Sequence, residues 1–133
     1  MSFQRGLSTY RQTQVQSRTP LELVVMLYDG ALKFLSQARD AIERGDIPAR
    51  RDASTRALAI ISELQSTLNM EQGGELAERL DALYGYVNAC ILQAAAENAV
   101  GPLDSATRVL ATLRDSWVTI AAPAADVPVR GAA

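Results

Sequence analysis

Apolar residues in this chain recur every three or four positions along four long stretches, and no stretch alternates apolar with polar residues. The first pattern is typical of amphipathic helices, whereas the second would be needed for a half-buried sheet. Short connections separate the stretches, which favours antiparallel neighbours. The sequence therefore predicts an all-α protein, an antiparallel up-down four-helix bundle with helices near residues 20–44, 48–68, 75–96 and 103–121.

Local signals place the helix ends. Thr19 is a natural N-cap, Pro20 fits the first helical position, and Glu22 completes a capping box. Gly45 supplies a left-handed stop, and Asp46 can cap the next helix. The later breaks are predicted at "NMEQGG", with a new helix opening at Glu75, and at "ENAVGP" (residues 69–74 and 97–102).

The chain divides into three parts: an N-terminal arm (1–18), the bundle (19–121) and a tail (122–133). The arm is polar, lacks the apolar region of a secretory signal, and carries scattered apolar residues. We expect it to be mobile, or to contain a short extra helix, and to lie over a groove through a few anchors. The Ala/Pro/Val-rich tail has no apolar period, which indicates disorder.

Charge is spread unevenly along the chain. The arm holds three arginines and no acid, whereas residues 19–121 hold nine basic and fourteen acidic residues, a formal charge of −5. Three arginines make a weak nucleic-acid footprint, and an arm that folds back on its own acidic domain is the simpler interpretation. No apolar run approaches 18 residues, so we expect no membrane insertion. A lone Cys90 is consistent with a reducing cytoplasm.

The chain has no histidine. This excludes Ser-His-Asp and Cys-His catalysis, histidine-containing metal sites and histidine phosphotransfer. Asp29 has no catalytic partner in the sequence, because the nearest acids along the helix are Glu22 and Asp40, two and three turns away. We therefore predict that the protein is not an enzyme and uses no cofactor or metal.

Tyr-Asp-Gly in the middle of the first apolar helix (residues 28–30) needs an explanation, because a mid-helix glycine costs about 1 kcal/mol relative to alanine. Gly30 would permit close approach, either of another helix inside the bundle or of a partner. Asp29 would lie on the solvated rim or bond a neighbouring loop. Tyr84 and Tyr86 are two apart, so one should join the core while the other faces outward.

Four motifs occur in order: "YRQTQVQSRTP", "LVVMLYDGALKFL", "IISELQSTLNMEQGGELAERLDALYGYV" and "LRDSW". Together they resemble the FliS family, the flagellin-specific flagellar secretion chaperones, over roughly residues 10–121. The chain departs from the family's pattern at Arg18, Asn69, Gly85 and Ala89-Cys90. Gly85, Ala89 and Cys90 all lie in the predicted third helix.

The resemblance implies a helical bundle that holds the C-terminal segment of flagellin in the cytoplasm, prevents early polymerisation and assists delivery to a component of the export gate. It also implies that the N-terminal arm covers part of the groove. Small residues such as Gly30, Ala31 and Gly85 would let a client helix come close. The candidate client-binding residues are Leu7, Tyr10, Val15, Leu27, Tyr28, Asp29, Gly30, Ala31, Tyr84 and Gly85.

Two alternatives from other classes stay open. One is a non-catalytic interaction or regulatory bundle that dimerises through the same apolar strips, and it predicts a stable homodimer without affinity for flagellin. The other is a nucleic-acid binder that uses the arginine arm, against which the acidic body argues. Without a client, the chaperone interpretation predicts a monomer or a weak homodimer.

Overall fold

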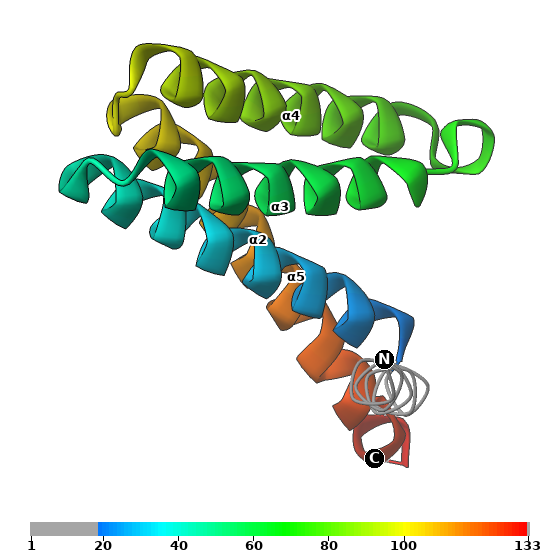
Figure 1. The fold of residues 1–133 in the computed structure, drawn as a ribbon. Coiled ribbons are helices and arrows are strands. Elements are labelled where there is room, and N and C mark those ends of the chain that lie inside the picture. Colours follow the sequence, from blue (N-terminus) through cyan, green and yellow to red (C-terminus); the bar gives the residue numbers. More distant parts are fainter. Residues whose placement is uncertain (1–18, 133) are drawn as a thin grey trace, which may run out of the picture.

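The computed structural model describes the backbone of residues 19–132 and the side chains of residues 19–121. In this part of the chain the backbone forms four helices and no strand: α2 (Pro20–Arg44), α3 (Ile47–Ser66), α4 (Met70–Glu97) and α5 (Gly101–Ala132). Successive helices run antiparallel (Figure 1). The predicted all-α four-helix bundle is confirmed.

The four helices are arranged as a square in which each helix has two neighbours. α2 packs against α3 and α5, and α4 packs against the same two helices. α2 and α4 are therefore diagonal, as are α3 and α5. Figure 1 shows α2 and α5 running obliquely to α3 and α4, so that the bundle opens toward the N-terminal end of α2.

The predicted N-caps form at the N-terminal ends of α2 and α3. The Thr19 hydroxyl accepts the Glu22 N–H at 3.2 Å, and Asp46 accepts the Ala49 N–H at 3.0 Å. Between the two helices Gly45 adopts φ +72°, and the Asp46 N–H donates to the Ala41 carbonyl at 2.9 Å. This is the hydrogen bond of a Schellman motif, in which a left-handed residue lets the chain leave the helix.

The α3–α4 connection differs from the prediction. α4 begins at Met70 rather than at Glu75, because the Asn69 side chain caps an extra turn by accepting the Gln72 N–H at 2.9 Å. Gly74, with φ +52° and ψ −128°, then interrupts the helix before it continues. Only glycine adopts that conformation without strain. Gly74 therefore separates the extra turn from the long part of α4, which restarts at Glu75, the predicted helix start.

The last helix, α5, also extends beyond the end predicted from its apolar period. α5 continues to Ala132, whereas the apolar period ends at Ala121.

Small side chains let the helices approach closely in the core. Eight of the buried apolar residues are alanines, and the larger side chains fill the layers between them. Burial of these larger groups supplies the main stabilising term, about 1.5–3 kcal/mol for each fully buried side chain. The largest fully buried side chains are Tyr28, Leu35, Ile61, Leu64, Val87, Ile91, Leu103 and Leu110.

Among the residues that the structure describes, no helix has the length and apolar character needed to cross a membrane.

Candidate functional site

Tyr28, Asp29 and Gly30 each contact a different helix of the bundle. α2 turns by about 100° per residue, so three consecutive side chains leave it in three directions. Tyr28 reaches across the core to α4, Asp29 reaches α5, and Gly30 lies against α3. This short segment therefore helps to fix α2 relative to all of the other helices.

Tyr28 meets Tyr84 on the diagonal helix. Their hydroxyl oxygens are 2.6 Å apart, and their ring centroids are 6.3 Å apart at a tilt of 58°. Burial raises the pKa of both phenols; for Tyr84 the bond to Tyr28 raises the pKa further, whereas for Tyr28 the bond to Tyr84 lowers it in part. Both hydroxyls stay protonated at neutral pH, so the pair acts as a hydrogen-bonded strut rather than as an acid or a base.

Trp117 on α5 packs against the core beside this pair. The nearby indole lowers the pKa of Tyr28 slightly, although its N–H does not meet the geometry of a hydrogen bond. The buried N–H has no partner among the described residues.

Asp29 pairs with Arg114 of α5. The Arg114 guanidinium donates from Nε to Oδ1 at 2.7 Å and from Nη2 to Oδ2 at 3.5 Å. The hydrogen bond and the charge of Asp29 raise the pKa of Arg114. Asp29 is half-exposed and bonds a neighbouring helix, where the sequence predicted a solvated rim or a neighbouring loop.

Gly30 faces α3 inside the bundle. A Cβ placed on Gly30 would lie 3.1 Å from Cδ1 of Ile60, which is tighter than ordinary van der Waals contact. Of the two predicted uses of this glycine, the structure shows close helix–helix approach. Gly85 differs, because a Cβ placed there would meet nothing within 4 Å.

The remaining predicted site residues are divided between core and surface. Tyr28, Ala31 and Tyr84 are buried in the core, and Gly85 is exposed. Tyr84 points inward while Tyr86 is 49% exposed, so the predicted division of the two tyrosines is confirmed. Leu7, Tyr10 and Val15 lie outside the described residues. That these ten residues bind a client stays a prediction.

Leu27 belongs to an apolar groove between the N-terminal half of α2 and the C-terminal end of α3. We call this the α2–α3 groove. Only Leu27 of this groove was predicted from the sequence, because the α2 candidates were the consecutive segment 27–31 that the family resemblance implies. The signal was present in the almost wholly apolar run that opens α2. The groove is lined by Pro20, Leu23, Val24, Met26, Leu27, Glu63 and Thr67.

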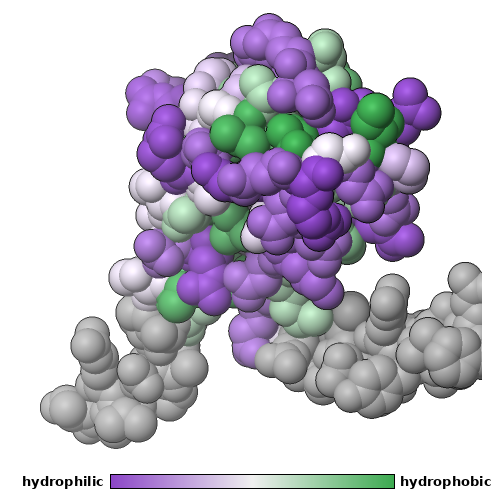
Figure 2. All heavy atoms as spheres, turned by 60° about the vertical axis from the view of Figure 1, so that its left-hand side comes forward, coloured by the Kyte–Doolittle hydropathy of each residue, from purple (hydrophilic) through white to green (hydrophobic). Residues whose placement is uncertain are grey.

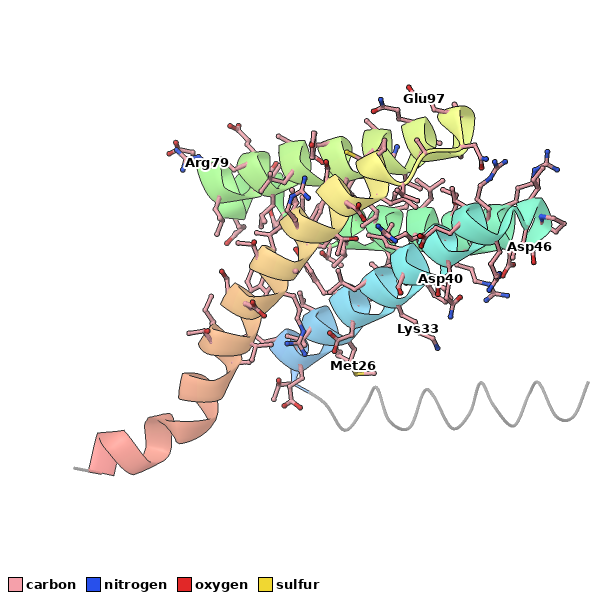
Figure 3. All side chains as sticks on the ribbon, turned by 90° about the vertical axis from the view of Figure 1, so that its left-hand side faces the viewer. Met26, Lys33, Asp40, Asp46, Arg79 and Glu97 are labelled. Atoms are coloured by element: carbon pink, nitrogen blue, oxygen red, sulfur yellow. The ribbon has the colours of Figure 1, made fainter. Side chains whose placement is uncertain are left out.

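The α2–α3 groove is accessible on the described part of the molecule. Met26 is 38% exposed, and Figure 3 shows its side chain projecting from the N-terminal end of α2. On the face drawn in Figure 2, apolar side chains reach the surface in small groups among polar ones. An apolar groove between two helices can accept the apolar side of a third helix.

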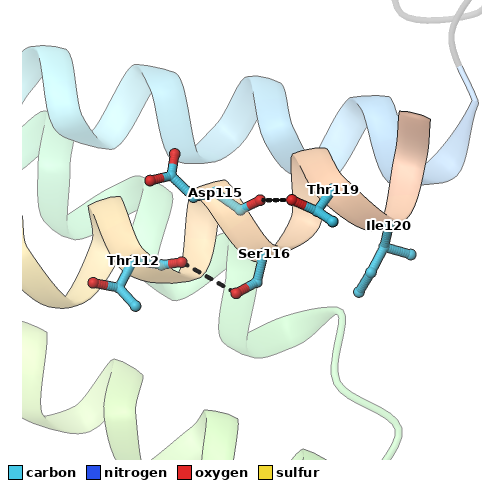
Figure 4. A pocket seen from close by; sticks show the side chains of 5 residues that line it. All are labelled: Thr112, Asp115, Ser116, Thr119 and Ile120. Atoms are coloured by element: carbon cyan, nitrogen blue, oxygen red, sulfur yellow. Dashed lines mark hydrogen bonds between the residues drawn. The ribbon is translucent and has the colours of Figure 1, made fainter. Parts of the chain in front are cut away.

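A more polar hollow on α5 is less suited to binding. Two of its hydroxyls are already used by their own helix: Ser116 donates to the Thr112 carbonyl at 3.2 Å, and Thr119 donates to the Asp115 carbonyl at 2.9 Å (Figure 4). Such bonds to the preceding turn leave fewer donors for a ligand. Within residues 19–121 no group of three or more acidic or cysteine side chains is arranged to hold a metal ion.

A family model described as flagellar protein FliS matches residues 3–124 of the chain. The chain belongs to the FliS family. It is 36% identical over 117 residues to the flagellar secretion chaperone FliS of Bacillus subtilis, covering 88% of this chain and 86% of that relative. It is 35% identical to FliSB of Pseudomonas aeruginosa, covering 85% and 93% of the two chains. For FliS of Salmonella typhimurium the identity is 34%, with 86% and 89% covered.

The resemblance predicted from the sequence motifs is thereby confirmed. Membership of the FliS family supports a role as an export chaperone, which is a non-enzymatic role. Such a role implies a protein partner. Some of the motif residues contact one another and so hold the bundle together. Tyr28 of "MLYDGA" bonds Tyr84 of "LDALYGY", and Asp29 bonds Arg114 of "LRDSW".

Proposed function

We propose that this protein binds the disordered C-terminal segment of flagellin in the cytoplasm, prevents its premature polymerisation and assists its delivery to the flagellar export apparatus. The observation that carries the proposal is the accessible apolar α2–α3 groove on a member of the FliS family. Relatives of the chain are named flagellar secretion chaperones. The family resemblance implies that the protein held before export is flagellin.

The mechanism requires only binding. A client segment that folds as an amphipathic helix in the α2–α3 groove would place its apolar side against Leu23, Met26 and Leu27. The apolar residues of the client segment would then be unavailable for contacts between flagellin molecules. Because a disordered client loses conformational entropy when it folds, the total interface must be large, on the order of 2,000 Å².

The N-terminal arm has a place in this proposal as a competitor for the groove. The arm joins the bundle at Thr19, directly before Pro20, which lines the groove. Glu63 on the rim is complementary in charge to the arm's three arginines. An arm that covers the groove in part of the population lowers the apparent client affinity by the uncovered fraction.

Calorimetry with a peptide of the C-terminal segment of flagellin from the same organism tests the proposal, with light scattering to count the chains. We expect a 1:1 complex and a negative heat-capacity change from burial of apolar surface. Met26→Glu should weaken binding at least tenfold, whereas Leu92→Glu, at an exposed apolar position on α4 outside the groove, should not. A stable homodimer without affinity for the peptide would support the interaction-protein alternative instead.

Deletion of residues 1–18 tests the competing arm. The helical content per residue of the bundle should remain, and the peptide should bind more tightly than to the full chain. Weaker binding after the deletion would show that the arm contributes contacts to the client rather than competing with it.

A further inference from the structure

The outer side of α4 is apolar although it faces solvent. Two of its large apolar side chains are about half-exposed, Tyr86 at 49% and Leu92 at 52%. α4 packs against α3 and α5, and no other described helix covers its outer side. An exposed apolar face of this kind is a candidate for contact with another protein. The exposed residues that share it, which we call the α4 outer face, are Ala82, Gly85, Tyr86, Ala89, Leu92, Gln93 and Ala96.

The α4 outer face follows the seven-residue pattern of a contact between two helices. Ala82, Ala89 and Ala96 are seven residues apart. Gly85 and Leu92 each lie three residues after one of these alanines and fill the second apolar position of the repeat. In coiled coils this pattern forms the contact line with a second helix. From Ala82 to Ala96 the line is about 21 Å long, or about four turns.

Gly85 and Leu92 give the face a hollow and a projection. A Cβ placed on Gly85 would meet nothing within 4 Å, so the helix surface is open there. Leu92 projects about two turns further along the same side. If two copies of α4 pack antiparallel with Ala89 at the twofold axis, Leu92 of each copy lies over Gly85 of the other. The α4 outer face is therefore complementary to itself.

Charge favours this antiparallel arrangement. Arg79 and Glu97 are five helical turns apart, so they leave α4 on the same side near its opposite ends (Figure 3). In the antiparallel pair, Arg79 of each copy comes within about 3 Å, along the helix axis, of the level of Glu97 of the other. Parallel packing would instead place each Arg79 beside its own counterpart. Arg79 also pairs with Glu75 of its own helix, but these side chains are 74% and 77% exposed, so a second carboxylate can approach.

We propose that the α4 outer face binds a second copy of this chain as a symmetric, antiparallel α4–α4 pair with Ala89 at the twofold axis. A single helix face buries less than the roughly 1,200 Å² of stable interfaces, so the dimer should be weak, with a Kd of about 0.1–1 mM. α4 is diagonal to α2, so the dimer leaves the α2–α3 groove open. The inference goes beyond the proposed function and does not depend on it.

The sequence ties this contact to the present chain rather than to its family. Gly85 and Ala89 are two of the positions at which the chain departs from the family's pattern. The chain's own N-terminal arm is a poorer occupant. It joins the bundle at the start of α2 and would have to pass α3 or α5 to reach the α4 outer face.

Sedimentation equilibrium of the full-length protein without a client, from about 0.01 to about 2 mM, tests the inference. The wild type should pass from monomer to dimer across this range. Leu92→Glu should stay monomeric, because it would bury a carboxylate without a partner. Met26→Glu, at an exposed apolar position on the diagonal helix α2, is the control and should dimerise like the wild type. Circular dichroism establishes that each variant is folded.

Charge exchange tests the direction of the pair. Arg79→Glu should weaken dimerisation by about three- to tenfold at low salt, because it sets two carboxylates against each other at both ends of the contact. Adding Glu97→Arg restores opposite charges across an antiparallel contact and should recover most of the lost affinity. In a parallel pair the double variant would keep like charges together, so a failure to recover would overturn the proposed arrangement.

Other results would overturn the inference as a whole. A wild type that remains monomeric at about 2 mM would show that the face does not self-associate. A dimer lost in Met26→Glu and kept in Leu92→Glu would place the contact in the α2–α3 groove. Dimerisation only after deletion of residues 1–18 would assign the face to the arm. A dimeric protein that binds no flagellin segment would overturn the proposed function alone.

Discussion

The guanidinium of Arg114 on α5 donates to the carboxylate of Asp29 on α2 at 2.7 Å, although the two residues are 85 positions apart in the chain. A second, longer contact of 3.5 Å aligns the two groups side by side. Both side chains remain partly exposed to solvent. The pair therefore sets how α5 lies along α2 and is open to screening by salt.

We predict that Asp29→Asn leaves client binding largely intact and lowers thermal stability slightly. The amide can still accept a hydrogen bond from Arg114, but the charge attraction is lost. Because the pair is exposed, the difference in Tm between variant and wild type should shrink as salt is added. Thermal unfolding at low and high salt checks this. Complete loss of binding by a folded variant would instead assign Asp29 a direct charge contact with the client.

Tyr84→Phe should destabilise the bundle by about 1–3 kcal/mol, because it leaves the buried Tyr28 hydroxyl without its 2.6 Å partner. Adding Tyr28→Phe should cost less than the sum of the two single changes, since no unpaired hydroxyl then remains. Chemical denaturation of the two single variants and the double variant measures the coupling. Tyr86→Phe, on the exposed side of α4, is the control and should leave stability nearly unchanged.

The two mid-helix glycines should respond differently to substitution. Gly85→Ala should stabilise the protein by about 0.5–1 kcal/mol, because the new methyl group meets no neighbour and alanine favours the helix. Gly30→Ala should raise the stability by less, since its Cβ would lie 3.1 Å from Cδ1 of Ile60. Gly30→Leu should overpack the α2–α3 contact and cost about 1–3 kcal/mol. Urea unfolding compares the three, and a gain for Gly30→Ala equal to that for Gly85→Ala would show that Ile60 moves aside freely.

The ion pair between Asp104 and Arg39 predicts a contribution to acid stability. The hydrogen bond from Arg39 is the main cause that holds the pKa of Asp104 below its ordinary value of 3.8. In the unfolded chain Asp104 therefore takes up its proton at a higher pH than in the folded protein. Its stabilising contribution is fully present above pH 3.8 and is lost as the pH falls through the folded-state pKa.

Asp104→Asn removes this contribution and provides the test. Urea unfolding at several pH values should show the variant less stable than the wild type at neutral pH, with the two converging in acid. Asp40→Asn, at an exposed position on α2, is the matched control for a general change in net charge. A constant difference between Asp104→Asn and the wild type at all pH values would mean that the carboxylate charge is not what stabilises the pair.

The helix ends near Thr19, Gly45 and Asp46 could be predicted because their signals lie within a few residues of one another. The extra turn before Gly74 was missed for a related reason. A Gly-Gly pair reads as a stop, and the cap from Asn69 to Gln72 becomes visible only when the preceding helix is known to end at Ser66. Local chemistry thus determines these boundaries, and the one-turn helix between Asn69 and Gly74 is too short to carry an apolar period that would reveal it.

The contacts of the Tyr-Asp-Gly segment were less accessible to sequence reasoning. The pattern of α4 predicts that one of Tyr84 and Tyr86 faces inward, but it does not say that the inward one meets Tyr28. Nothing near Asp29 in the chain points to Arg114. Partners on different helices are set by how the helices are placed around the core, and a single sequence does not state that placement. The α2–α3 groove was missed except for Leu27, because the family resemblance pointed to residues 27–31 and not to the apolar residues before them.

The position of Trp117 has a practical consequence. It is the sole tryptophan of the chain, and it lies one turn beyond Arg114 on α5, packed against the core beside Tyr28. Selective excitation of its indole therefore reports on one known place, where α5 meets α2, without any attached dye. A client that shifts the last turns of α5 will change the wavelength and intensity of that emission. Tryptophan fluorescence can therefore report client binding without a label.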